Sequence, residues 1–225
     1  MKNFSCGILA AALMVGMAGI SYAQPASKGS ANVSSVALMQ ATTETHSWDP
    51  VLSSTIKTAN QKDLLIGVSL ETGLYTQTLV KSSGGTKDTS NATAGIQIRV
   101  LVDGVQAAPG EVTYDKRSQT LSATLGGYFA NCTDENGDGI TDVLTECDLL
   151  PEEIELILNT MAAHHFNFIL ANLAPGDHTI VVQAEIKSNN TSQTGSSSAW
   201  ATIGKGSLTV EEIRAVNSPE GIVLD

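Results

Sequence analysis

The residues with the clearest potential for chemistry lie in segment 131–155. Nine of its side chains are acidic, and the wider interval 118–186 contains no Lys or Arg. So dense an acidic cluster repels itself unless a cation or water screens it. Residues 134–142 also follow a regular order, D-x-N-x-D-G-x-x-D, in which oxygen-bearing side chains alternate with other residues. This segment therefore suits the binding of a cation.

This order resembles the calcium loop of EF-hand, dockerin and thrombospondin type 3 proteins. In such loops the side chains at positions 1, 3 and 5 converge on one ion, and the glycine at position 6 permits a sharp turn. The carbonyl at position 7 adds a ligand, and position 9 contributes directly or through water. The resemblance implies Ca²⁺ as cofactor, with Glu146 added from just beyond the loop. The expected ligands are Asp134, Asn136, Asp138, the Ile140 carbonyl, Asp142 and Glu146.

The loop departs from the EF-hand pattern at position 12. Thr145 stands where a bidentate glutamate is usual, and Glu146 comes one residue late. Strand-like sequence precedes the loop in place of an entering helix. The resemblance therefore implies a structural calcium site and not a sensor. The alternative interpretation is an acidic, solvated turn that binds no metal.

The N-terminus has the pattern of a secretory signal peptide over residues 1–23. A basic start precedes an uncharged apolar run at 8–20, and small residues lead to a cleavage site after Ala23. The run is short of the roughly 20 residues that span a bilayer, although an uncleaved anchor remains the alternative. We expect a secreted, extracellular or periplasmic chain, with residues 24–35 as a flexible leader.

Export also determines the expected state of the cysteines. Cys6 leaves with the signal peptide, so only Cys132 and Cys147 remain. In an oxidising compartment two cysteines most simply form one disulfide, which here would bracket the acidic loop. The alternative is a pair of free, buried thiols.

Alternating apolar residues predict the strands that hold this loop. Period-two rows indicate antiparallel sheets with one wet face, and Asp103-Gly104 is a hairpin signal. Segment 81–94 reads as a polar loop. We expect one all-β domain over residues 36–225, an antiparallel β-sandwich or jelly roll of about nine or ten strands, with the acidic insertion at 131–155. The rows lie within 64–70, 96–102, 166–170, 180–186 and 208–210.

One short helix is expected at about 151–165. Pro151 suits a first helical position, and the glutamates that follow it favour the positive end of a helix. An apolar stripe at helical spacing follows, made of Ile154, Ile157, Leu158 and Met161.

The C-terminal strands, residues 173–184 and 203–210, resemble the closing strands of C1q/TNF-like jelly-roll heads. This resemblance implies self-association and a role in binding. It assigns no functional residue.

Composition and motifs argue against several classes of function. The net charge of −11 argues against partners that are nucleic acids or anionic membranes. The sequence has no nucleotide-binding glycine pattern and no G-x-S-x-G elbow. We therefore expect a non-catalytic structural, surface or adhesion module that binds calcium, self-associates, or binds an extracellular surface or glycan. The alternatives are a carbohydrate-binding module that uses calcium or Trp48 and Trp200, and a secreted hydrolase.

Overall fold

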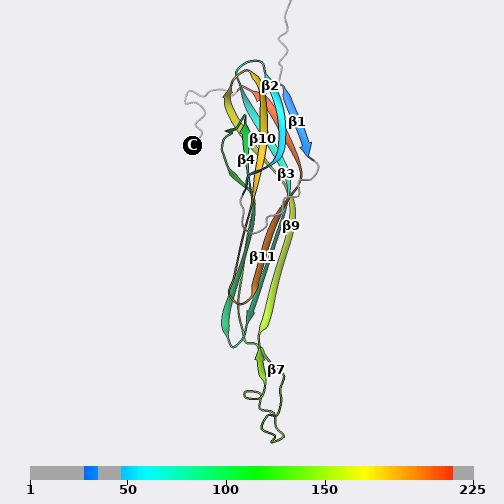
Figure 1. Cartoon of the computed structure of the whole chain (residues 1–225), viewed down its shortest axis with the longest axis vertical. Helices are drawn as coiled ribbons and strands as arrows, with labels where there is room; N and C mark the ends of the chain where they lie inside the picture. Colours follow the sequence, from blue (N-terminus) through cyan, green and yellow to red (C-terminus); the bar gives the residue numbers. More distant parts are fainter. Residues whose placement is uncertain (1–27, 35–46, 215–225) are drawn as a thin grey trace, which may run out of the picture.

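Long β-strands in two antiparallel sheets, packed face to face, make up the described part of the chain (Figure 1). The structure is a computed structural model and describes residues 28–34 and 47–214; the predicted signal peptide lies outside them. The eleven strands found there are β1 Gly29–Ser34, β2 Asp49–Thr58, β3 Lys62–Ser82, β4 Thr86–Val102, β5 Val105–Gln106, β6 Val112–Leu125, β7 Tyr128–Ala130, β8 Asp148–Leu150, β9 Glu152–Leu173, β10 Gly176–Ser192 and β11 Ser196–Ile213.

The two large sheets form the predicted sandwich. One has the order β1-β11-β3-β9, and the other has the order β2-β10-β4-β5 with β6 also paired to β4. A small third sheet joins β7 to β8. Every strand pair is antiparallel. The all-β, antiparallel sandwich expected from the sequence is therefore confirmed.

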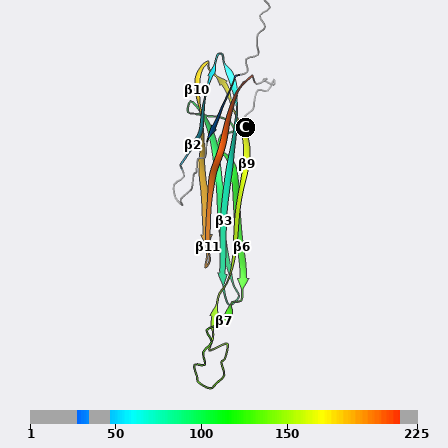
Figure 2. The same ribbon diagram turned by 90° about the vertical axis from the view of Figure 1, so that its right-hand side faces the viewer.

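The sandwich is a long rod in both views (Figures 1 and 2). At about 3.3 Å per residue, the 22 residues of β9 span roughly 70 Å. Gly29 of β1 pairs with Glu211 of β11, so the described chain begins and ends near one end, which we call the base. β7 and β8 project from the opposite end, which we call the tip (Figure 1).

The interior of the rod differs along its length. Near the base the alternating rows meet in one aliphatic core, as predicted, with Phe168 among its largest buried side chains. Nearer the tip the interior also contains many polar side chains, which are hydrogen-bonded to one another or to the backbone. Gln119 of β6 accepts from Thr76 (2.7 Å) and donates to Thr78 (2.6 Å). The buried polar residues of this half are Thr76, Thr78, Ser82, Asp88, Ser90 and Gln119.

The helix expected at 151–165 is wrong. These residues lie in β9, which pairs with β3 in unbroken register from Leu64↔Leu170 to Ser82↔Glu152. Ile154 and Leu158 belong to the helical stripe, but with Leu156 between them they also fit a period of two, and pairing along β3 decides between the two. The described residues contain no helix, and thus none long and apolar enough to cross a membrane.

Two polar segments were also misread. Residues 29–34, which lie in the expected leader, form β1 on the edge of β11. The expected loop at 81–94 is a tight hairpin at Gly84-Gly85, and β4 already begins at Thr86. These strands lack an apolar row because their inward positions are polar or, in β1, because the side chains lie on an exposed edge.

Candidate functional site

The acidic loop, residues 131–147, is held at the tip by β7 and β8. These strands pair from Tyr128↔Leu150 to Ala130↔Asp148 and so carry both ends of the loop away from the sandwich (Figure 1). Gly127 permits the sharp departure from β6. Its φ is 82°, and a Cβ there would lie 2.7 Å from the Leu150 carbonyl oxygen.

A disulfide closes the loop. Cys132 and Cys147 are bonded with an S–S distance of 2.01 Å, which confirms the predicted pairing. The two residues are 15 apart in the chain. In the chain-entropy model a link over this span is worth about 3 kcal/mol, because it restricts the unfolded chain.

The loop curls around its own acidic side chains. Asp134 accepts the N–H groups of Gly137 (2.7 Å) and Gly139 (2.8 Å), one with each carboxylate oxygen. Asn136 accepts the N–H of Asp138, two residues further on. Both glycines have positive φ, 73° and 82°, which side chains rarely permit. The alternating oxygens predicted from the sequence therefore lie along one curled segment.

Glu146 fills the centre of this curl. Its side chain is only 9% exposed and accepts three backbone N–H groups. The donors are Glu135 (3.1 Å), Asn136 (3.3 Å) and Asp142 (2.7 Å). The sequence suggested only a late calcium ligand. The contacts instead make this carboxylate a bridge between the two arms of the loop, a role that spacing alone could not reveal.

The loop offers oxygen donors, which calcium prefers. All six expected ligands lie within it, and the side chains of Asn136, Asp138 and Asp142 are exposed. A carboxylate oxygen that accepts one N–H keeps a further lone pair for an ion. Within residues 28–34 and 47–214 no three His, Cys, Asp or Glu side chains are grouped so that they could hold a metal. Asn136 and the Ile140 carbonyl would add two further oxygen donors, so the loop's donors fit calcium in type.

A second polar cluster lies at the base. His178 of β10 is at its centre, with Nδ1 2.6 Å from Asp103 Oδ2 and Nε2 2.9 Å from the Ala174 carbonyl oxygen. The hydrogen bond with Asp103 raises the pKa of His178, and the same bond lowers the pKa of Asp103. Thr58 Oγ1 lies 3.2 Å from Nε2, but that hydroxyl is 2% exposed and also donates to Ala174. This buried hydroxyl therefore joins the end of β2 to the turn between β9 and β10 and to His178 of β10.

The two tryptophans each lie against another side chain. Trp200 of β11 stacks on Tyr75 of β3, with ring centroids 5.0 Å apart and planes 9° apart. The Arg99 guanidinium lies 4.4 Å from the centroid of Trp48. Both tryptophans remain partly exposed.

Apolar side chains are exposed along the tip half of β9. This strand lies at the edge of its sheet, and side chains from β6 reach across to it. Gln119 donates to the Leu156 carbonyl (2.9 Å), and the Tyr114 hydroxyl donates to the His164 carbonyl. These bonds cover part of the edge but leave the apolar side chains uncovered. The exposed set is Ile154, Leu156, Ile157, Leu158 and Met161.

Comparison with known proteins gives no relative for this chain: no protein-family model matches it, and no curated protein matches it.

Proposed function

We propose that this chain is an exported, non-catalytic surface or adhesion module that holds a calcium-stabilised loop at the end of a rigid rod. The observation that supports the proposal is that the ends of the described chain and the acidic loop lie at opposite ends of the rod. The described chain begins and ends at the base, and the disulfide-closed loop lies at the other end of a sandwich with strands of about 70 Å. A chain attached at its base would present this loop outward.

The contents of the tip half support binding and not catalysis. The loop exposes Ile140, Val143 and Leu144 among its acids, and the neighbouring stretch of β9 exposes further apolar side chains. Contiguous exposed apolar surface is typical of sites that contact a partner. A rod with such a tip needs no reaction centre to act as a surface module.

Calcium binding is the part of the proposal that can be tested most directly. Extracellular calcium modules bind with dissociation constants of roughly 10⁻⁴ to 10⁻³ M. At about 10 mM calcium, binding to the folded state alone would add about 1.4 to 2.7 kcal/mol. For a chain of this size that corresponds to a rise in melting temperature of roughly 3 to 10 °C.

The experiment compares melting of the exported chain, residues 24–225, in calcium and in chelator. Asp138→Asn removes the charge of an expected ligand and should abolish most of the calcium-dependent rise. Glu135→Gln removes an equal charge from an exposed neighbour outside the expected ligand set and should preserve the rise. Equal melting of the unsubstituted chain in calcium and in chelator would refute the calcium site.

A carbohydrate-binding module is the second candidate, because the stacked Trp200 and Tyr75 rings are partly exposed on one sheet. Binding of a neutral polysaccharide should then change tryptophan fluorescence. Trp200→Ala should remove the change and Trp48→Ala should preserve it, with melting curves to confirm folding of both variants.

A further inference from the structure

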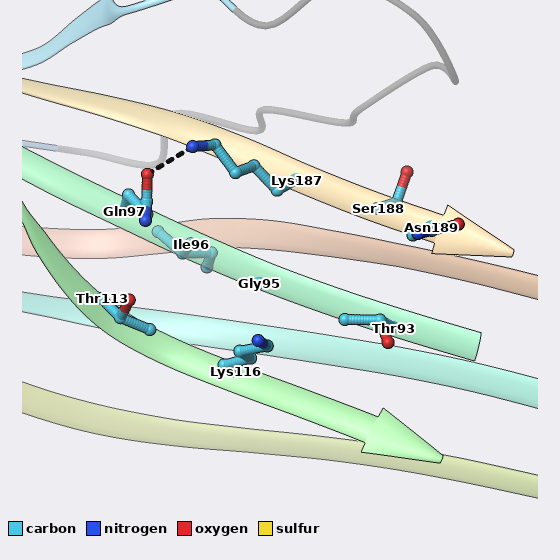
Figure 3. Close-up of a pocket in the computed structure, with 9 residues that line it drawn as sticks. All are labelled: Thr93, Gly95, Ile96, Gln97, Thr113, Lys116, Lys187, Ser188 and Asn189. Atoms are coloured by element: carbon cyan, nitrogen blue, oxygen red, sulfur yellow. Dashed lines mark hydrogen bonds between the residues drawn. The ribbon is translucent and has the colours of Figure 1, made fainter. Parts of the chain in front are cut away.

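A groove crosses the outer face of the five-stranded sheet, away from the tip loop. It has a volume of about 320 Å³ and lies where β10, β4 and β6 run side by side (Figure 3). Gly95 of β4 forms part of its floor, and its cross-strand partners are Lys187 of β10 and Lys116 of β6. The side chains of two lysines therefore flank a residue that has no side chain.

The fold does not require glycine at the floor. A Cβ on Gly95 would meet its nearest atom, the Asp115 carbonyl oxygen, at 3.5 Å, which is an ordinary contact. Glycine within a strand costs stability, and it often marks a place where a ligand or another chain approaches closely. The missing side chain thus keeps the space between the lysines open.

One of the two lysines of the groove, Lys116, carries a positive charge that no described carboxylate pairs with, whereas Lys187 is paired with Glu185. Lys187 Nζ lies 2.6 Å from Gln97 Oε1 and 3.2 Å from Glu185. Lys116 has no ion pair or side-chain hydrogen bond within residues 28–34 and 47–214. In a chain with a net charge of −11, such a site favours an anionic partner.

The same chain supplies a surface of matching charge. Residues 131–150 hold six acids and no Lys or Arg, and they expose Leu144 (81%) beside Asp142. A molecule's own loop cannot fold back into its groove. About nine residues of β4, roughly 30 Å of strand, separate Gly95 from the tip end of the sandwich, and the loop extends further in the same direction (Figure 1).

We propose that the acidic loop of a second copy occupies this groove. Its carboxylates would accept hydrogen bonds from Lys116 and Lys187, and an exposed apolar side chain such as Leu144 would lie over Gly95. The two surfaces differ, so the contact is heterologous. Each bound copy then offers a free groove and a free loop, and the copies build open chains.

The test measures self-association by sedimentation equilibrium in chelator, so that calcium does not alter the charge of the loop. We expect concentration-dependent association of residues 24–225 at 50 mM salt and its loss at 500 mM. Lys116→Gln with Lys187→Gln should weaken association by roughly three- to tenfold, as expected for surface ion pairs. Gly95→Val should weaken it without lowering the melting temperature. Lys57→Gln, a change of the same charge at an exposed lysine on the strand β2, should have no effect.

A mixing experiment distinguishes this contact from other modes of self-association. One variant carries Gly95→Val, Lys116→Gln and Lys187→Gln, which fills the groove and leaves it without a charge that the other variant's loop could bind. The other carries Glu135→Lys and Asp148→Lys, which reverses two exposed charges outside the expected calcium ligands. Each variant alone should stay monomeric, and a mixture should form dimers and nothing larger, because only one groove and one loop remain compatible.

Three results would overturn the proposal: a monomer at every concentration and salt, association that survives the groove substitutions, or mixed variants that fail to pair. A monomeric chain that binds polygalacturonate only when Lys116 is present would assign the groove to an acidic glycan and also overturn it. None of these results depends on whether the loop binds calcium.

Discussion

Asp88 is a buried carboxylate that ties together two turns near the tip. It is 2% exposed and accepts backbone N–H groups from Lys81 (2.8 Å), Thr89 (2.8 Å) and Thr194 (3.1 Å). It thus joins the β3–β4 hairpin to the turn between β10 and β11. Burial raises the pKa of Asp88, but the hydrogen bonds from Lys81, Thr194 and Thr89 outweigh it and lower the pKa from 3.8 to about 2.

The substitution Asp88→Asn tests this role. Because the pKa of Asp88 is lowered to about 2, its ionised form stabilises the fold by about 2 kcal/mol at neutral pH. The amide keeps one acceptor oxygen, but its NH₂ group faces backbone donors and leaves at least one of them unpaired, at a cost of about 1 to 3 kcal/mol. We expect the free energy of unfolding at pH 6 to fall by about 2 to 4 kcal/mol.

The pH dependence is the sharper measurement. A lowered pKa in the folded state gives stability that is present above the unfolded pKa and is lost as the pH falls toward the folded value. Urea unfolding between pH 6 and pH 2 should therefore show the gap between the original chain and Asp88→Asn shrinking by about 2 kcal/mol. Asp177→Asn, at an exposed acid near the base, should leave the curve unchanged. Parallel curves for the original chain and Asp88→Asn would refute the reasoning.

Three further perturbations follow from the structure. His178→Gln should remove a loss of stability that sets in above about pH 6.5. The pKa of this histidine is raised in the folded state, so its contribution is full below the unfolded pKa of about 6.5 and is lost as the pH rises through the folded pKa; urea unfolding at several pH values measures this. Gly195→Ala should lower the free energy of unfolding by at least about 2 kcal/mol, because its Cβ would lie 1.8 Å from a backbone carbonyl oxygen of β3. Gly95→Ala should leave the free energy of unfolding unchanged or slightly raised, and thermal melts of the two variants measure the difference. Replacing Cys132 and Cys147 by Ser should lower the free energy of unfolding by up to about 3 kcal/mol. It should also speed cleavage within the loop in limited proteolysis, and an unchanged rate of cleavage would contradict the idea that the disulfide restrains the loop.

The sequence predicted the fold best where apolar residues alternate. The rows around Ile98 and Val182 are buried as expected, because one face of each strand meets the aliphatic core. Strands with polar inward positions were missed. Asp88 and Ser90 point into the sandwich, where hydrogen bonds satisfy them, and no local pattern distinguishes such residues from those of a loop. β9 was misassigned because its apolar residues fit two periods and only pairing with β3 decides between them.

The candidate sites also differ in how far the sequence could predict them. The acidic loop is continuous in the chain, so its pattern of oxygen-bearing residues is visible in the sequence, and its disulfide was predicted because only two cysteines remain after export. The expected insertion at 131–155 was too long, because Asp148–Leu150 form β8 and β9 begins at Glu152. The groove could not be predicted, because Gly95, Lys116 and Lys187 are distant in sequence and only the register of three strands brings them together. The bridging role of Glu146 depends on how the loop curls, which spacing does not specify.

The interiors of the two halves of the rod differ, and this difference bears on the proposed function. Near the base the interior is mainly aliphatic, apart from the small polar cluster of Thr58 and His178. Near the tip, Gln119 and its threonine partners are buried, and Leu156 and Leu158 are exposed on the neighbouring edge. A buried polar network stabilises only the arrangement that satisfies all its members. It therefore holds the tip half in a defined shape without using the apolar side chains of β9. Those side chains stay available on a rigid surface beside the loop, as a module that meets a partner through its tip requires.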